Sequence, residues 1–69
     1  MSKHKYPLGS LLLGKREDFL GYIQEHTENF YGDPQYSIYW FQGQYISHSI
    51  SEKYVEEGIK WYKKKFGDV

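Results

Sequence analysis

The sequence predicts a mainly β fold with a C-terminal helix, an α+β arrangement. Residues 9–48 form short apolar and aromatic runs separated by glycine, proline and charged turns, which is typical of β-strands. Residues 53–66 instead repeat apolar side chains at a spacing of three or four, which is typical of an amphipathic helix. We therefore expect an antiparallel sheet of four strands, either curled or closed into a small barrel, capped by the helix.

Length and composition favour a single domain over residues 1–69. The chain has no cysteine, 39% hydrophobic residues and 20% aromatic residues, so its core must come from a few large side chains. The lack of cysteine is compatible with a reducing compartment, and we expect a cytoplasmic protein. No apolar run approaches the ~20 residues of a membrane span, and no apolar leader precedes a cleavage site, so we expect no membrane contact.

The first strands are predicted from two apolar runs. After a lead-in over residues 1–8, residues 10–13 form a short strand with a glycine at each end. A charged turn at 15–18 leads to a second strand at 19–26. Gly21 lies within this strand, which indicates a bulge or the close approach of another backbone.

The strongest strand signal follows a predicted loop. Residues 27–34 end in a cluster of glycine, aspartate and proline, and we expect a long loop there. Residues 35–41 alternate, with Tyr36, Ile38 and Trp40 on one face. Because the other face is also bulky, we expect a central strand covered on both sides.

The last strand and the helix complete the fold. A tight turn at 42–43 precedes a strand at 44–48, and the helix is expected over 49–66. Ser49 and Glu52 have the spacing of a capping box at its start. Gly58 lies inside the predicted helix, where glycine lowers helix stability by about 1 kcal/mol relative to alanine unless another element packs against it. The expected buried stripe is Val55, Ile59, Tyr62 and Phe66.

The aromatic residues form the main candidate binding site. Seven of the fourteen lie within residues 30–45. Either Leu11, Ile38 and Trp40 make the core, with Tyr39 and Phe41 supporting the helix, or the rings form a face for a protein or a methylated cation. Tyr31 and Tyr36 flank a loop and are harder to explain as core. The candidate binding face is Tyr22, Tyr31, Tyr36 and Tyr39.

Nucleic acid is the second candidate partner. The formal net charge is zero, which lacks the basic excess typical of a dedicated nucleic-acid binder. The lysines nevertheless concentrate near the two ends, so a local basic patch beside aromatic rings would suit a single strand. The residues that would contact phosphate are Lys15, Arg16, Lys60, Lys63 and Lys64.

Catalysis is poorly supported, and we expect no enzyme activity, metal or cofactor. His4, His26 and His48 lack the spacing of metal ligands, and no glycine-rich loop has the ending of a phosphate-binding loop. Ser47 and His48 are adjacent in a strand, so their side chains point to opposite faces and cannot act together.

The first strands resemble the opening of SH3-like barrels of the KOW and Tudor type. The matching features are the glycine, polar and apolar residues at 9–13, the charged turn at 15–18 and the apolar-Gly-x-apolar strand at 20–23. Residues 36–43 are similar to the third strand of small barrel proteins common in tailed-phage genomes. The resemblance covers residues 8–50. It implies a non-catalytic module that binds a peptide, protein or nucleic acid.

A protein is therefore the favoured partner. The resemblance implies a small phage-type accessory protein that contacts a host or virion protein. Self-association is a further hypothesis, because Tyr54 and Trp61 lie at the margin of the helix stripe and would pair across a two-fold axis.

Overall fold

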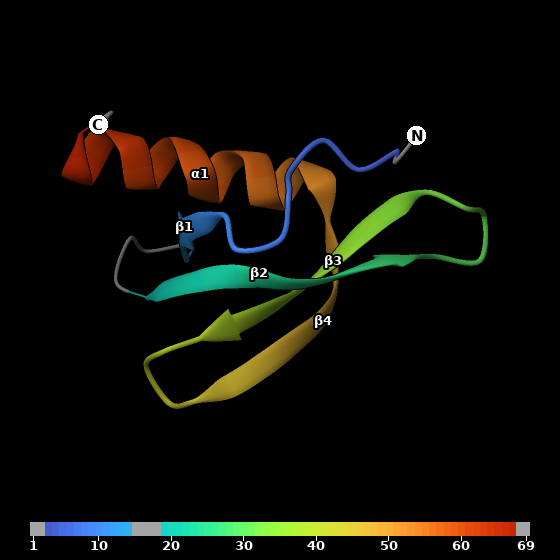
Figure 1. Cartoon of the computed structure of the whole chain (residues 1–69), viewed down its shortest axis with the longest axis horizontal. Helices are drawn as coiled ribbons and strands as arrows, with labels where there is room; N and C mark the ends of the chain where they lie inside the picture. Colours follow the sequence, from blue (N-terminus) through green and yellow to red (C-terminus); the bar gives the residue numbers. More distant parts are fainter. Residues whose placement is uncertain (1–2, 15–18, 68–69) are drawn as a thin grey trace.

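A computed structural model describes residues 3–14 and 19–67, and the predicted charged turn at 15–18 lies outside these ranges. The elements are β1 (Leu11–Leu13), β2 (Leu20–Glu28), β3 (Pro34–Trp40), β4 (Tyr45–Ser51) and α1 (Glu52–Phe66). The strands form one antiparallel sheet in the order β1-β2-β3-β4, and α1 lies along β1 (Figure 1). The mainly β fold with a C-terminal helix is confirmed.

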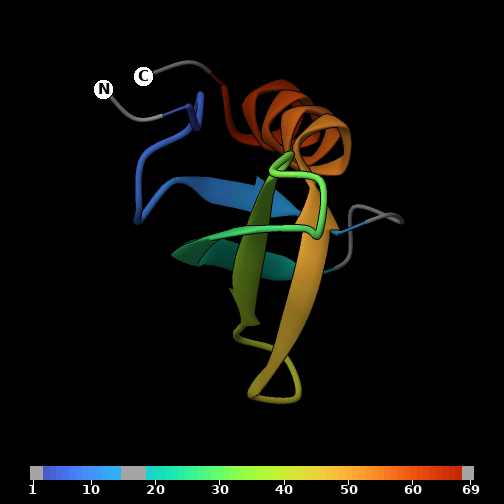
Figure 2. The ribbon, with the colours of Figure 1, turned by 90° about the vertical axis from the view of Figure 1, so that its right-hand side faces the viewer.

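The sheet is curled and open. Figure 2 shows β3 and β4 running steeply across the direction of β1 and β2, which reflects the strong twist of the sheet. In the part of the chain that the structure describes, β1 pairs only with β2 and β4 pairs only with β3. The sheet is therefore the curled alternative of the prediction, not a closed barrel.

The core lies between one sheet face and α1. The predicted alternation along β3 is confirmed there, because Tyr36 and Ile38 are fully buried and Trp40 is 4% exposed. The other buried members of this core cluster are Leu12, Ile23 and Val55. The helix thus covers the part of this face that carries the core cluster.

Two glycines allow backbones to approach closely. A Cβ atom on Gly58 would lie 2.7 Å from the carbonyl oxygen of Leu13 and 2.8 Å from Cδ1 of Leu12. The helix therefore packs directly on β1, which offsets the cost of an interior helical glycine. A Cβ atom on Gly21 would lie 2.6 Å from the carbonyl oxygen of Tyr39, which confirms the predicted close approach.

The predicted long loop over 27–34 is wrong. The flanking strands continue into it from both ends and leave only residues 29–33 as the hairpin loop. The side-chain oxygen of Asn29 accepts hydrogen bonds from the backbone N–H groups of Tyr31 (2.8 Å) and Asp33 (2.9 Å). This side chain satisfies two turn amides at once, so a short loop suffices.

The predicted start of the helix is also wrong. The N-cap is Ser51, whose hydroxyl accepts a hydrogen bond of 3.3 Å from the backbone N–H of Tyr54. Ser49 has a φ of 59° and lies where the register of β4 shifts. Pairing with β3 keeps β4 extended through Ser51, and this tertiary contact overrides the local capping signal. The predicted end of the helix at Phe66 is confirmed.

Candidate functional site: the outer face of the sheet

An apolar row crosses the sheet face opposite α1. Leu11 pairs with Tyr22, Tyr22 with Tyr39, and Tyr39 with Ile46. Directly paired residues share a face, and alternation places this row away from buried Ile38. Leu11 and Ile46 are each 39% exposed, and the two tyrosines are half-buried. We call these residues the outer row.

Three rings of this face pack against one another. The ring centroids of Tyr22, Tyr39 and Phe41 lie 5.5–5.6 Å apart in every pair. These are the separations of directly packed aromatic pairs, so the rings leave no room for a cation between them. We call these residues the aromatic patch. Because the patch lies opposite α1, the interpretation that Tyr39 and Phe41 support the helix is wrong.

The other predicted tyrosines lie elsewhere. Tyr36 is fully buried in the core. Tyr31 is 85% exposed at the tip of the β2–β3 hairpin, where its ring packs edge-on against Phe30. Of the four tyrosines in the candidate face, Tyr22 and Tyr39 are therefore the pair brought into ring contact.

The buried phenol of Tyr36 belongs to a polar cluster that joins the lead-in to α1 by hydrogen bonds. It donates to the carboxylate of Glu52, which also accepts the backbone N–H of Lys5 at 3.0 Å. Burial and the bond to Glu52 raise the pKa of Tyr36 to about 12, while the bonds from Tyr36 and Lys5 lower the pKa of Glu52. The hydroxyl of Tyr6 donates to Glu56 at 3.0 Å, and burial together with this bond raises the pKa of Tyr6.

Two histidines join the same cluster. The rings of His4 and His26 stack at 4.2 Å with an interplanar angle of 8°. Nε2 of His4 lies 2.8 Å from the carbonyl oxygen of Thr27 and 3.1 Å from that of Gln35, and Nε2 of His26 lies 2.7 Å from that of Tyr6. Because carbonyl oxygens only accept, both Nε2 atoms donate. The rings thus hold the lead-in against the β2–β3 hairpin.

Catalytic groups do not assemble at the other candidate positions. Ser47 accepts a hydrogen bond of 2.9 Å from the indole of Trp40, whereas His48 bonds to Ser37 at 3.0 Å. Their side chains point to opposite faces, as the sequence predicted. Among residues 3–14 and 19–67, no group of three or more histidine, aspartate or glutamate side chains is placed to hold a metal ion.

The basic candidates that the structure describes lie on α1. Lys15 and Arg16 fall outside the described residues. Lys60, Lys63 and Lys64 are exposed on α1, where Lys60 forms an ion pair of 3.8 Å with a neighbouring glutamate. The helix that carries these three lysines packs on the covered face of the sheet, whereas the rings of the patch lie on the outer face.

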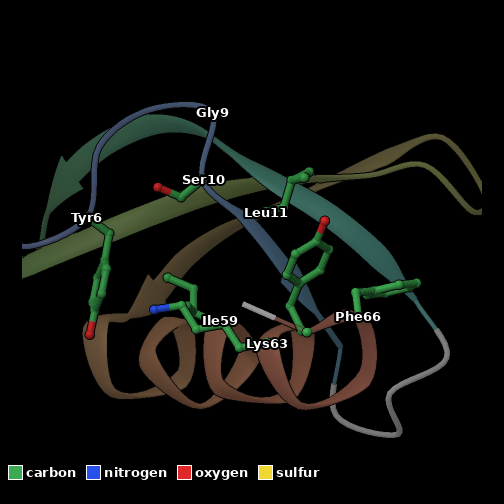
Figure 3. Close-up of a pocket in the computed structure, with 9 residues that line it drawn as sticks. Tyr6, Gly9, Ser10, Leu11, Ile59, Lys63 and Phe66 are labelled. Carbon is green, nitrogen blue, oxygen red and sulfur yellow. The ribbon is translucent and has the colours of Figure 1, made fainter. Parts of the chain in front are cut away.

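Apart from the outer face, a groove lies between α1 and the segment before β1. This groove has a volume of about 490 Å³ and is drawn in Figure 3. Its apolar wall is formed by Tyr6, Ile59, Tyr62 and Phe66, with Lys63 beside them, and Leu11 at the end of the outer row borders it. Phe66 is 52% exposed here, so the end of the predicted helix stripe is not buried. No sequence pattern indicated this groove, because the groove depends on where the lead-in lies against the helix.

Sequence reasoning did not include Leu11, Phe41 and Ile46 in the candidate face. The interpretation that placed Leu11 in the core is wrong, because Leu11 is 39% exposed on the outer face. One signal was available, since alternation along residues 35–41 places Phe41 on the same side as Tyr39. The positions of Leu11 and Ile46 depend on strand register, which neither strand alone specifies.

Comparisons with known proteins gave no family. No protein-family model, curated protein or solved structure matched the chain. Separately, none of the helices within the described residues has the length and apolar character needed to cross a membrane. The function is therefore inferred from the geometry of the outer face.

Proposed function

We propose that this chain is a non-catalytic binding module that contacts a partner protein through the outer face of its sheet. The aromatic patch is the observation that carries this proposal. Its three rings pack on one another, and Phe41 remains 49% exposed. Half-buried aromatic side chains of this kind supply large contact area at little entropic cost and are enriched at protein interfaces.

The chemistry of the face indicates an apolar partner surface. The outer row contains two aliphatic residues and two tyrosines and no charged side chain. A partner segment with aliphatic or aromatic side chains would bury these rings while leaving their phenol groups at the rim. The resemblance to small phage proteins supports a host or virion protein as the partner class.

A protein is favoured over nucleic acid because of where the lysines lie. Binding of a single strand combines base stacking on rings with phosphate contacts to nearby lysine or arginine. Lys60, Lys63 and Lys64 are on α1, which packs on the covered face of the sheet. Bases stacked on the aromatic patch would therefore lie on the other face of the sheet from the helix that carries these cations.

A random peptide library selected against the protein tests the proposal. We expect the enriched peptides to carry apolar side chains and to bind the double variant Tyr39→Ser/Phe41→Ser at least about tenfold more weakly, because truncating central interface aromatics typically costs more than 1 kcal/mol. The matched control is Phe30→Ser/Tyr31→Ser, which removes two rings that are exposed at the hairpin tip. This control should bind like the wild type. Circular dichroism checks that both variants are folded.

Two results would contradict the proposal. If the tip variant loses binding and the face variant keeps it, the contact surface is the β2–β3 hairpin tip. If no peptide is enriched and a labelled single-stranded oligonucleotide binds with an affinity that falls steeply with salt, the protein is a nucleic-acid binder.

A further inference from the structure

The two edge strands of the sheet, β1 and β4, differ in how far other elements cover their backbone groups. β1 is three residues long, and α1 approaches its Leu13 carbonyl closely enough to exclude a Cβ atom at Gly58. β4 is seven residues long, and in the described part of the chain the backbone of residues 45–48 has cross-strand partners on β3 alone. In Figure 1, β4 forms the lower margin of the sheet.

The hydrogen-bond pattern identifies which backbone groups of β4 face outward. The N–H of Phe41 donates to the carbonyl of Leu20 at 3.0 Å, so this pair belongs to the hydrogen-bonded set of the β2–β3 ladder. Hydrogen-bonded and non-hydrogen-bonded pairs alternate along an antiparallel ladder. The pair of Tyr39 with Tyr22 lies two residues further on and is therefore also hydrogen-bonded, so the backbone N–H and C=O groups of Tyr39 point toward β2. Its partner on β4 is Ile46. The N–H and C=O groups of Ile46 therefore both point away from β3, at the open edge.

This edge lacks the features that usually prevent strand addition. Exposed edges are commonly interrupted by lysine, proline or a bulge. The sequence of β4 contains no proline and no acidic or basic side chain other than His48. Its irregularity lies at Ser49, which has a φ of 59° and follows the regular stretch of residues 45–48. The stretch around Ile46 is thus regular, uncharged and open.

We propose that β4 pairs antiparallel with β4 of a second copy of this chain, about a two-fold axis at Ile46. The two Ile46 residues would then face each other and exchange their outward N–H and C=O groups. Tyr45 of each copy would lie opposite Ser47 of the other, so no like charges meet. The sheet would double to eight strands.

The position of Ile46 in the outer row favours a second copy over an unrelated strand. Ile46 ends that row on β4, and it is 39% exposed. A two-fold axis at this residue joins the outer rows of both copies into one apolar surface and covers both Ile46 side chains. Tyr54 and Trp61, which the sequence suggested for self-association, contact each other on α1 with ring centroids 6.5 Å apart, and their pairing across a two-fold axis stays a separate prediction. This inference does not depend on the proposed function.

Measurement of the molar mass by light scattering, from micromolar to millimolar protein, tests the inference. We expect the wild type to approach twice its monomer mass of 8.3 kDa as the concentration rises. Ile46→Pro removes the outward donor, and proline is tolerated at an edge where the N–H faces solvent. Its dimer should dissociate at about tenfold higher concentration or more, because each dimer loses two hydrogen bonds.

Two further variants complete the test. Ile46→Val keeps the donor and an aliphatic side chain, so it should dimerise like the wild type. Ile46→Lys places two ammonium groups opposite each other at the axis and should be monomeric, which provides a second test if the proline variant fails to fold. A wild type that stays monomeric at millimolar concentration would overturn the inference. So would a folded Ile46→Lys variant that still dimerises.

Discussion

The two faces of this sheet are built by the same strands but are covered differently. Along β3, Ile38 and Trp40 lie under α1 with 0% and 4% exposure, whereas Tyr39 between them is half-buried on the outer face. The rings of Tyr22, Tyr39 and Phe41 pack against one another on that face. Large side chains on the two faces therefore become core on one and partly exposed surface on the other, depending on where the helix packs.

The largest difference should appear between neighbouring residues of β3. We expect Ile38→Ala to lower the free energy of unfolding by about 2–5 kcal/mol, because it leaves a cavity in a fully buried site. Tyr39→Ala, one residue along, should cost about 1 kcal/mol, since its ring is partly in water already. Urea denaturation measures both values. Equal losses would show that the outer face is part of the core.

A second variant tests how the helix covers its face. Gly58→Ala introduces a methyl group where the nearest atoms, in Leu12 and Leu13, are 2.8 Å and 2.7 Å away. We expect a loss of about 1–3 kcal/mol from overpacking, although alanine has the better helix propensity. The exposed Lys64→Ala provides the control and should change stability by less than about 0.5 kcal/mol. A stabilised Gly58→Ala protein would show that α1 does not pack directly on β1.

A third variant tests the polar cluster beneath the lead-in. Tyr36→Phe keeps the ring but removes the hydrogen bond to Glu52, and we expect a loss of about 1 kcal/mol at neutral pH. The pH dependence should change as well. The pKa of Tyr36 is raised from 10.0 to about 12. The stabilisation that its protonated phenol contributes is therefore fully present below pH 10 and is lost as the pH rises toward 12. Urea midpoints across this range should fall less steeply in the variant.

Tyr36→Phe should also change how stability depends on pH in acid, where stability is lost as the pH falls. The pKa of Glu52 is lowered from 4.5, so its contribution is present above that value and is lost as the pH falls below it. Tyr36 is the largest cause of this shift, so Tyr36→Phe should reduce the acid loss. Glu52→Gln removes the titrating carboxylate and serves as the control. An unchanged acid profile in both variants would show that this bond does not form in solution.

The sequence predicted those features that depend on local periodicity. Alternation placed Tyr36, Ile38 and Trp40 on one face, and the helical spacing placed Val55 in the core. Gly21 was correctly identified as a close approach of another backbone. Each of these features follows from the period of one element and its immediate neighbours.

Features that depend on contacts between elements were not predictable in the same way. Tyr36 and Tyr39 both carry large rings, and only the position of α1 decides which of them is buried. Ser49 carries a strong capping signal, yet Ser51 caps the helix because β4 remains paired with β3. The hairpin at 29–33 closes early because one asparagine side chain bonds two amides, a geometry that composition alone does not reveal.

The ties of the lead-in to α1 have a consequence for the order of folding. Lys5 and Tyr6 bond to Glu52 and Glu56, which lie 47 and 50 residues away along the chain. During synthesis the strands emerge before the helix, so the sheet has all its pairing partners while the lead-in still has none of its helical ones. The bonds of residues 5 and 6 to the helix can therefore form only after the helix is made, whereas the bonds from His4 and His26 that join the lead-in to the hairpin do not need it.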